Sequence, residues 1–113
     1  MNQLTEWRKL IQNVLSEHAV LIRQASTSGL ETYTIFDEST DNYLLFRLGW
    51  LGKKRIYAPI LHVRIENDKF WIEEDSTEAG IATDLLEAGV PKSSIALAFR
   101  HPSVRPLTEF AVA

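Results

Sequence analysis

The sequence predicts a single α+β domain over residues 1–113: a long N-terminal helix, a four-stranded antiparallel meander, a second helix, a fifth strand and a docked C-terminal tail. Three observations predict this fold class. Apolar residues recur at helical spacing through residues 2–25 and again through residues 81–86. Residues 43–75 hold three β-type runs separated by turn-sized gaps. Because consecutive runs with short connections usually pair, we expect the strands to form a meander on which the helices pack.

The N-terminal helix is expected over residues 2–25, where an apolar stripe is held for about six turns. Asn2 suits the N-cap position, and the turn-forming residues 26–29 end the helix at a glycine. We expect the stripe to pack on the sheet, because helices gain most of their stability from tertiary contacts. Its members are Leu4, Trp7, Ile11, Val14, Leu15, His18, Leu21, Ile22 and Ala25.

The first two strands are expected at residues 30–37 and 43–51. The first alternates in side-chain type, with Thr32, Thr34 and Phe36 on one side and Tyr33 and Ile35 on the other. The second is apolar at nearly every position, which is typical of a strand covered on both faces. A helix, the tail or another subunit could supply the second cover. Gly49 indicates a bulge or the close approach of another backbone.

The third strand covers residues 56–66 and the fourth covers residues 69–75. Pro59 lies within the third strand, and proline has no N–H to donate to a ladder. The strand is therefore expected to be an edge or to be bulged at that point. Asn67 and Asp68 form the turn between the two strands, since both residue types tolerate positive φ.

The second helix is predicted to open at residues 76–78, with a hydroxyl group or Asp75 as its cap, and to end at Gly89. Residues 95–99 then alternate as a fifth strand, and its two alanines indicate that another segment lies close over one face. The tail contains two prolines and is not expected to be regular before Leu107. Its last residues are apolar enough to dock on the domain.

Composition bounds the class of protein. The length suits one domain with one core. With 12 basic and 15 acidic residues the net charge is −3, so binding of DNA by general surface charge is not expected. The chain has no cysteine, which excludes disulfides and thiolate chemistry. Neither a signal peptide nor an apolar run of about 20 residues is present, and we expect a soluble cytoplasmic protein.

Enzyme motifs are not apparent. The sequence has no glycine-rich phosphate loop, no glycine-flanked nucleophilic serine and no paired histidines at helical spacing. We therefore expect no catalytic residue, no bound metal and no cofactor. The weaker alternative is a metal-dependent nuclease or other hydrolase that uses His62, Glu78 and Glu109. A single histidine within a strand is more often a packed, hydrogen-bonded residue than a ligand, and this is the reading we favour for His62.

Two sets of residues are candidates for binding. Aromatic and arginine side chains on neighbouring strands favour a partner-binding surface, although they could equally be core residues with arginines at the rim. This partner-binding set is Arg47, Trp50, Arg55, Tyr57 and Trp71. The basic connection before the third strand is read first as a solvated hairpin turn. The alternative is a local nucleic-acid-binding patch formed by Lys53, Lys54, Arg55, Arg100 and Arg105.

Taken together, these residues resemble the XisI family, the fdxN element excision controlling factor proteins of cyanobacteria and some other bacteria. The resemblance runs in order through nearly the whole chain. It is carried by residues 35–37, Tyr43, residues 49–50, Arg55, His62, residues 69–72, 75–78, 80–82, 89–92 and 95–99, Arg105 and residues 108–113. Phe70 and residues 58–59 depart mildly from the family pattern.

The resemblance implies a non-catalytic accessory or control factor for site-specific excision of a DNA element. Such a factor acts through protein contacts with a companion protein, XisH, and the family offers no defined catalytic residues. We expect self-association as well, because the second strand carries more apolar side chains than the two helices of this chain would cover. A sequence-tolerant DNA-binding regulator that uses the local basic patch is the alternative function.

Overall fold

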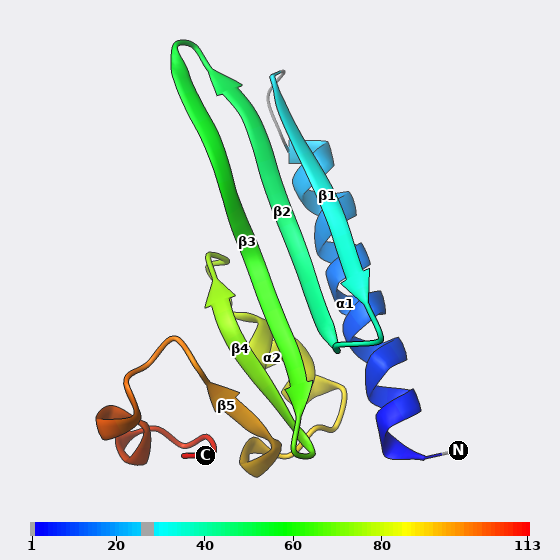
Figure 1. Ribbon diagram of the computed structural model, residues 1–113, viewed down its shortest axis with the longest axis vertical. Helices are drawn as coiled ribbons and strands as arrows, with labels where there is room; N and C mark the ends of the chain where they lie inside the picture. The colour runs from blue at the N-terminus through cyan, green and yellow to red at the C-terminus, as the bar shows by residue number, and fades with distance from the viewer. Residues whose placement is uncertain (1, 26–28) are drawn as a thin grey trace.

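The computed structural model describes residues 2–25 and 29–113. Its elements, in chain order, are α1 (Gln3–Ala25), β1 (Leu30–Asp37), β2 (Asn42–Leu51), β3 (Lys54–Glu66), β4 (Lys69–Asp75), α2 (Ile81–Glu87), the 3₁₀ helix η1 (Lys92–Ser94), β5 (Ile95–Leu97) and the 3₁₀ helix η2 (Pro102–Leu107) (Figure 1). The strand order follows the chain, β1-β2-β3-β4-β5. Strands β1 to β4 are antiparallel and β5 is parallel to β4, so the predicted α+β class and meander are confirmed.

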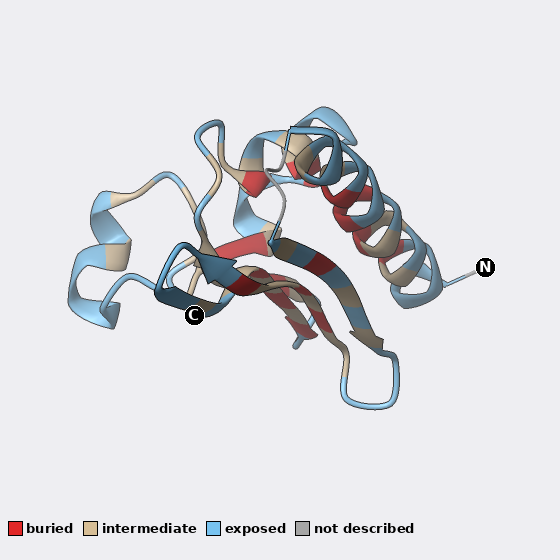
Figure 2. Ribbon diagram, turned by 90° about the horizontal axis from the view of Figure 1, so that it is seen from above, coloured by how far each residue is buried: buried red, intermediate tan, exposed pale blue. Residues whose placement is uncertain are grey.

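Both helices pack on the same face of the sheet (Figure 2). The core lies between them and that face, where Tyr43, Leu61 and Phe70 have no exposed surface. The indole ring of Trp7 stacks on the ring of Phe70, with centroids 4.5 Å apart. We call the helix-covered side of the sheet the inner face and the opposite side the outer face.

Helix α1 has the predicted cap and most of the predicted stripe. The backbone N–H of Thr5 donates to the Asn2 side-chain oxygen over 2.8 Å. The buried positions are Trp7, Ile11, Val14, Leu15 and Ala19. The prediction was wrong at Leu4, Leu21 and Ala25, which are exposed. Leu4 and Ala25 lie at the two ends of the helix, and in its last turns Ile22 packs on the core in place of Leu21. The predicted helix end at residues 26–28 lies outside the described residues.

Strand β2 is not covered on its outer face by either helix or by the tail. Leu44, Phe46 and Leu48 are half-buried there, and Trp50 is 53% exposed. Two of the three covers considered from the sequence are therefore excluded for this strand. The close approach predicted at Gly49 is confirmed: φ is +140°, and a Cβ atom there would lie 1.9 Å from the carbonyl oxygen of Gly29.

Strand β3 is bulged where the proline predicts it. Leu45 faces Leu61 and Phe46 faces Pro59, so Ile60 is the extra residue. Strand β4 pairs with β3 only from Leu61 onward, which also leaves the Pro59 segment at an edge. The turn at Asn67 and Asp68 has φ values of 52° and 59°, as expected from residues that tolerate positive φ.

The predicted start of the second helix is wrong. Helix α2 begins at Ile81, because Asp75 folds the preceding residues into a loop. Its carboxylate accepts the N–H of Thr77 over 2.9 Å and the N–H of Ile81 over 2.7 Å. Asp75 thus stabilises the first turn of the helix from six residues away. At the other end Gly89 has φ +95° and stops the helix, as predicted.

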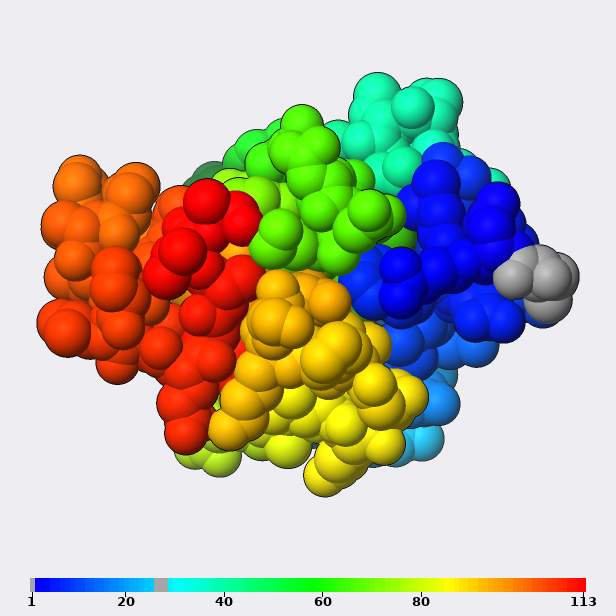
Figure 3. Space-filling model, turned by 90° about the horizontal axis from the view of Figure 1, so that it is seen from below, coloured from blue at the N-terminus to red at the C-terminus, as the bar shows by residue number. Residues whose placement is uncertain are grey.

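The end of the chain departs from the prediction in two ways. Strand β5 is shorter than residues 95–99, and residues 102–107 form the helix η2 instead of irregular chain. Pro102 suits the first position of that helix, and the His101 ring accepts the N–H of Ser103. The last residues dock on the domain as expected, since the backbone N–H of Ala111 donates to the carbonyl oxygen of Ile95 over 2.8 Å. In Figure 3 the segment near residue 100 (orange) stands out to one side.

Candidate functional site

The outer face of the sheet carries a continuous group of apolar side chains. Strand alternation and register place them opposite the buried residues: Tyr33 faces Phe46, Ile35 faces Leu44 and Tyr57 faces Leu48. Tyr33, Ile35 and Tyr57 are 44%, 48% and 68% exposed. Neither α1 nor α2 lies on this side (Figure 2). Large exposed apolar patches of this kind typically mark binding surfaces.

An arginine lies between two aromatic rings at the hairpin end of this face. The guanidinium carbon of Arg55 is 5.4 Å from the Trp50 ring centroid and 5.8 Å from that of Tyr57. Tyr57 also meets Phe46 edge to face at 4.9 Å. The structure thus brings together three residues of the predicted partner-binding set, Trp50, Arg55 and Tyr57. Since aromatic and arginine side chains dominate the energetics of interfaces, this is the strongest candidate site.

The other two residues of that set lie elsewhere. Arg47 shares the inner face with Leu45 and Tyr43, two and four residues before it, so strand alternation separates it from Trp50. Trp71 is on the outer face, but on β4 rather than beside the hairpin. Its indole N–H donates to the carbonyl of Glu66 over 2.9 Å, and Arg105 of the tail lies 5.8 Å from its ring.

The predicted basic patch is not one patch. Lys53 and Lys54 are exposed at the tip of the β2–β3 hairpin, whereas Arg100 and Arg105 belong to the tail at the opposite end of the domain (Figure 1). Arg105 donates to the carbonyl groups of Arg100 and Ala98 and so holds the tail in place. Only the hairpin lysines, with Arg55 beside them, remain as a local basic feature.

The residues of the metal hypothesis do not assemble. Among the described residues no group of three or more His, Asp or Glu side chains is placed to hold a metal ion. Burial lowers the pKa of His62, whose ring meets the Asn42 side-chain oxygen at 2.8 Å. His62 is therefore a packed, hydrogen-bonded residue, as favoured from the sequence. Glu109 pairs with Lys92 over 3.0 Å, and Glu78 is exposed.

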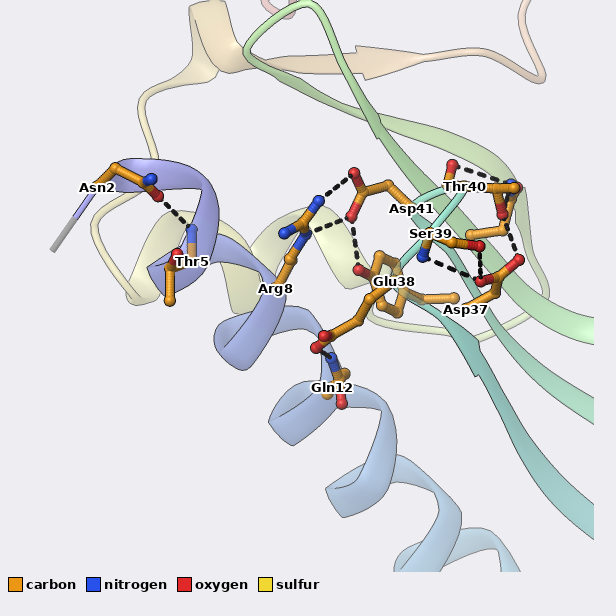
Figure 4. Close-up of polar contacts among 11 residues, drawn as sticks. Asn2, Thr5, Arg8, Gln12, Asp37, Glu38, Ser39, Thr40 and Asp41 are labelled. Carbon is orange, nitrogen blue, oxygen red and sulfur yellow. Dashed lines mark hydrogen bonds and ion pairs between the residues drawn. The ribbon is translucent and has the colours of Figure 1, made fainter.

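A polar anchor ties α1 to the loop between β1 and β2 (Figure 4). The Asp41 carboxylate accepts two N–H groups of Arg8, at 2.8 and 3.0 Å, and the buried Tyr43 hydroxyl at 2.7 Å. The hydrogen bond from Arg8 lowers the pKa of Asp41, and burial raises the pKa of Tyr43. This network fixes the loop at the end of the outer face away from the hairpin, and no sequence pattern indicated it.

Sequence reasoning placed Tyr33 and Ile35 on one side of the first strand but did not count them among the candidate site residues. Tyr33 and Ile35 alternate with the inward residues of that strand, and this alternation is the signal that could have placed them beside Phe46.

No helix of the described chain has the length and apolar character needed to cross a membrane.

Comparisons with known proteins agree with this fold. The family model described as XisI protein matches residues 1–112. A crystal structure of a XisI-like protein from Anabaena variabilis ATCC 29413 is 29% identical with a TM-score of 0.90, and the match covers 98% of this chain and 100% of that one.

A second crystal structure, of the fdxN element excision controlling factor XisI from the same organism, is 42% identical with a TM-score of 0.84, and the match covers 99% and 100% of the two chains. A comparison with curated protein sequences gives no match. The resemblance inferred from the sequence is confirmed, and the chain belongs to the XisI family.

Proposed function

We propose that this protein is a non-catalytic control factor for excision of a DNA element, and that it acts by binding a XisH-type companion protein through the outer face of its sheet. Membership of the XisI family and the 42% identity to an fdxN element excision controlling factor support a role in excision control. The single observation that carries the binding mode is the open outer face with Arg55 between Trp50 and Tyr57.

The chemistry of this face defines the partner it fits. Its centre is apolar and aromatic, while Lys53 and Lys54 lie exposed at its hairpin end. A partner surface with an apolar centre and acidic residues at the matching rim complements both features. The aromatic side chains supply buried area, and the lysines orient the encounter. The proposed occupant is the companion protein, and the test below distinguishes it from a second copy of this chain.

The test is co-expression with the companion, followed by size-exclusion chromatography with light scattering. A stable mixed complex is expected. Trp50→Ala and Tyr57→Ala should each weaken it by about 30-fold or more, the usual loss at an interface hot spot. Leu107→Ala is the matched control, because Leu107 is also apolar and 86% exposed but lies on η2. That variant should bind as the unchanged protein does.

Three results would contradict the proposal. If Trp50→Ala and Tyr57→Ala leave the affinity for the companion unchanged, the companion binds to another surface. A homodimer that these substitutions dissolve, without affinity for the companion, would make the face a contact between copies. If the protein is a monomer and forms no complex with the companion, the proposed function itself is wrong.

Direct DNA binding is the second candidate, favoured only by the two exposed lysines at the hairpin tip. It requires binding of a duplex that weakens steeply with salt and is lost when Lys53 and Lys54 are both changed to Glu. Fluorescence anisotropy of a labelled duplex at low and at physiological salt measures this. If the anisotropy of the duplex at low salt does not change when the protein is added, the DNA-binding candidate is excluded.

A further inference from the structure

The half of β3 that lies next to the hairpin turn has a strand on one side only. Strand β4 pairs with β3 only from Leu61 onward. The N–H of Ser76 still donates to the carbonyl oxygen of Ile60, but the chain then turns away into the loop that Asp75 holds. No strand of the described chain therefore lies beside residues 54–59 on the side away from β2 (Figure 1). Such an edge is a template for a strand from another molecule.

The backbone groups at this edge follow from the hydrogen bond of Trp50. Its N–H donates to Gly29, on the β1 side, so Trp50 and its β3 neighbour Arg55 form a pair that exchanges no hydrogen bonds. The N–H and C=O of Arg55 therefore point away from β2. Because this direction alternates along a strand, those of Tyr57 do the same, whereas Pro59 offers only its carbonyl oxygen. In the described structure these edge groups of Arg55 and Tyr57 have no backbone partner.

These edge groups are self-complementary in one register of a two-fold antiparallel pair. With Ile56 opposite Ile56 of a second copy, Arg55 of each copy lies opposite Tyr57 of the other, and each such pair can exchange two N–H···O bonds. A two-fold axis at Tyr57 would set Arg55 opposite Pro59, and the Arg55 carbonyl would lack a donor. An axis at Arg55 would set two like charges directly opposite each other, which is destabilising. The axis at Ile56 is therefore favoured.

The ends of this pairing are complementary in charge. In the favoured register the exposed Lys53 of one copy lies opposite Pro59 of the other, so its hairpin turn ends next to Ser76. Residues 73–78, around Ser76, carry four acidic side chains and no basic one. Opposite charges at the rim of an interface orient the encounter and fix the register. Two-fold symmetry repeats this contact at both ends of the pairing.

We propose that this protein forms a two-fold dimer in which residues 54–58 of two copies pair as antiparallel strands, with Arg55 of each copy opposite Tyr57 of the other. The second copy takes the place beside β3 that β4 leaves empty. The axis is perpendicular to the joined sheet, so both outer faces lie on the same side and their clusters of aromatic and arginine side chains adjoin. The pairing uses both β3 edges and therefore stops at two copies. This inference does not rest on the proposed function, because the dimer needs only this chain.

The first experiment uses the unmodified protein. Sedimentation velocity over a concentration series should show the mass rising from 12.9 kDa to twice that value. Amide hydrogen exchange should slow at the N–H groups of Arg55 and Tyr57 as the concentration rises. The N–H groups of Ile56 and Ala58 face β2 and are the internal control, since they should be protected at every concentration. A protein that stays a monomer, or a dimer in which Arg55 and Tyr57 exchange as in the monomer, would overturn the proposal.

The second experiment tests the register by cross-linking, since the chain has no cysteine of its own. Opposite residues that exchange no hydrogen bonds lie about 4.5 Å apart at Cα, within the range of a disulfide. Ile56→Cys should therefore give a disulfide-linked dimer under mild oxidation. Ala58→Cys is the matched control on the same face of the same strand, because its two copies would lie about 14 Å apart, four residues along the pairing.

The remaining outcomes also decide the matter. A disulfide that forms equally in both cysteine variants, or in neither, would overturn the proposed pairing. Protection of the Arg55 and Tyr57 amides that appears only when the companion protein is added would assign this edge to the companion instead of a second copy. A dimer that cross-links through Ile56→Cys but has no affinity for the companion would support this inference and contradict the proposed function, so the two can fail separately.

Discussion

The substitution Gly49→Ala tests how tightly β1 and β2 meet at the hairpin end of the sheet. Gly49 has φ +140°, and a Cβ atom there would lie 1.9 Å from the Gly29 carbonyl oxygen and 3.0 Å from its carbon. The same carbonyl accepts the N–H of Trp50 over 2.9 Å. Both obstacles are backbone atoms, so no side-chain rotation relieves the clash. The start of β1 must move away from β2.

The expected cost follows from these contacts. A non-glycine residue in this region of φ costs about 1–3 kcal/mol. Displaced packing adds about 1–3 kcal/mol, and loss of the Trp50 hydrogen bond adds about 0.5–1.5 kcal/mol. The free energy of unfolding should therefore fall by roughly 3–7 kcal/mol, a large share of the ~5–15 kcal/mol typical of a small domain.

Gly52→Ala is the matched control. Gly52 has φ +61°, but nothing lies within 4 Å of a Cβ atom there, so only the left-handed backbone is penalised, by about 1–2 kcal/mol. Any restriction of the unfolded chain by alanine is common to both variants and cancels. Urea unfolding followed by tryptophan fluorescence measures the difference, with buried Trp7 as a core reporter. Equal losses for the two variants would refute the role assigned to the close approach.

Four further predictions concern the side chains of Asp41, His62 and Asp75. Asp41→Ala should cost about 2–3 kcal/mol, because it leaves the Tyr43 hydroxyl buried without an acceptor, whereas Tyr43→Phe should cost about 1 kcal/mol; urea unfolding compares them. Since Arg8 lowers the pKa of Asp41, that carboxylate stabilises the fold above its unfolded pKa of about 3.9, and the contribution is lost as pH falls through the lowered value; acid unfolding should be less steep in Asp41→Ala. Burial lowers the pKa of His62, so the unfolded chain binds the proton more readily and stability should fall as pH drops below about 6.5. His62→Gln should remove this pH dependence of thermal unfolding. An NMR titration that gives an ordinary pKa for His62 would contradict the prediction. Asp75→Ala should cost about 1–2 kcal/mol and speed amide exchange at Thr77 and Ile81, and unchanged exchange would refute its capping role.

Much of the fold could be predicted because local chemistry decides it. Pro59 cannot donate to a ladder, and a bulge lies beside it; Asn67 and Asp68 tolerate positive φ, and the tight turn is there. The start of α2 could not be predicted in the same way. Capping residues were present at 76–78, but the Asp75 carboxylate binds N–H groups two and six residues ahead, and this reach depends on the loop conformation.

The candidate site was predicted in part, and the reason lies in sheet geometry. Trp50, Arg55 and Tyr57 flank one short turn, so pairing within one hairpin brings them together. Arg47 was grouped with them by residue type, although a period of two places it with the buried Tyr43. Trp71 has the right alternation, but β4 pairs only with the far half of β3, and strand lengths of this kind are not encoded in any local pattern.

The incomplete pairing of the sheet has a consequence for aggregation. Strand β1, the Lys54 half of β3 and strand β5 all present edges to which a strand from another molecule could add. Each edge has a feature that limits the addition of another strand. Exposed Glu31 and Asp37 place charge along β1, Pro59 removes a donor from β3, and the bridge from Ala111 to Ala96 closes β5. An apolar sheet face can therefore stay open while edge-to-edge fibril growth is disfavoured.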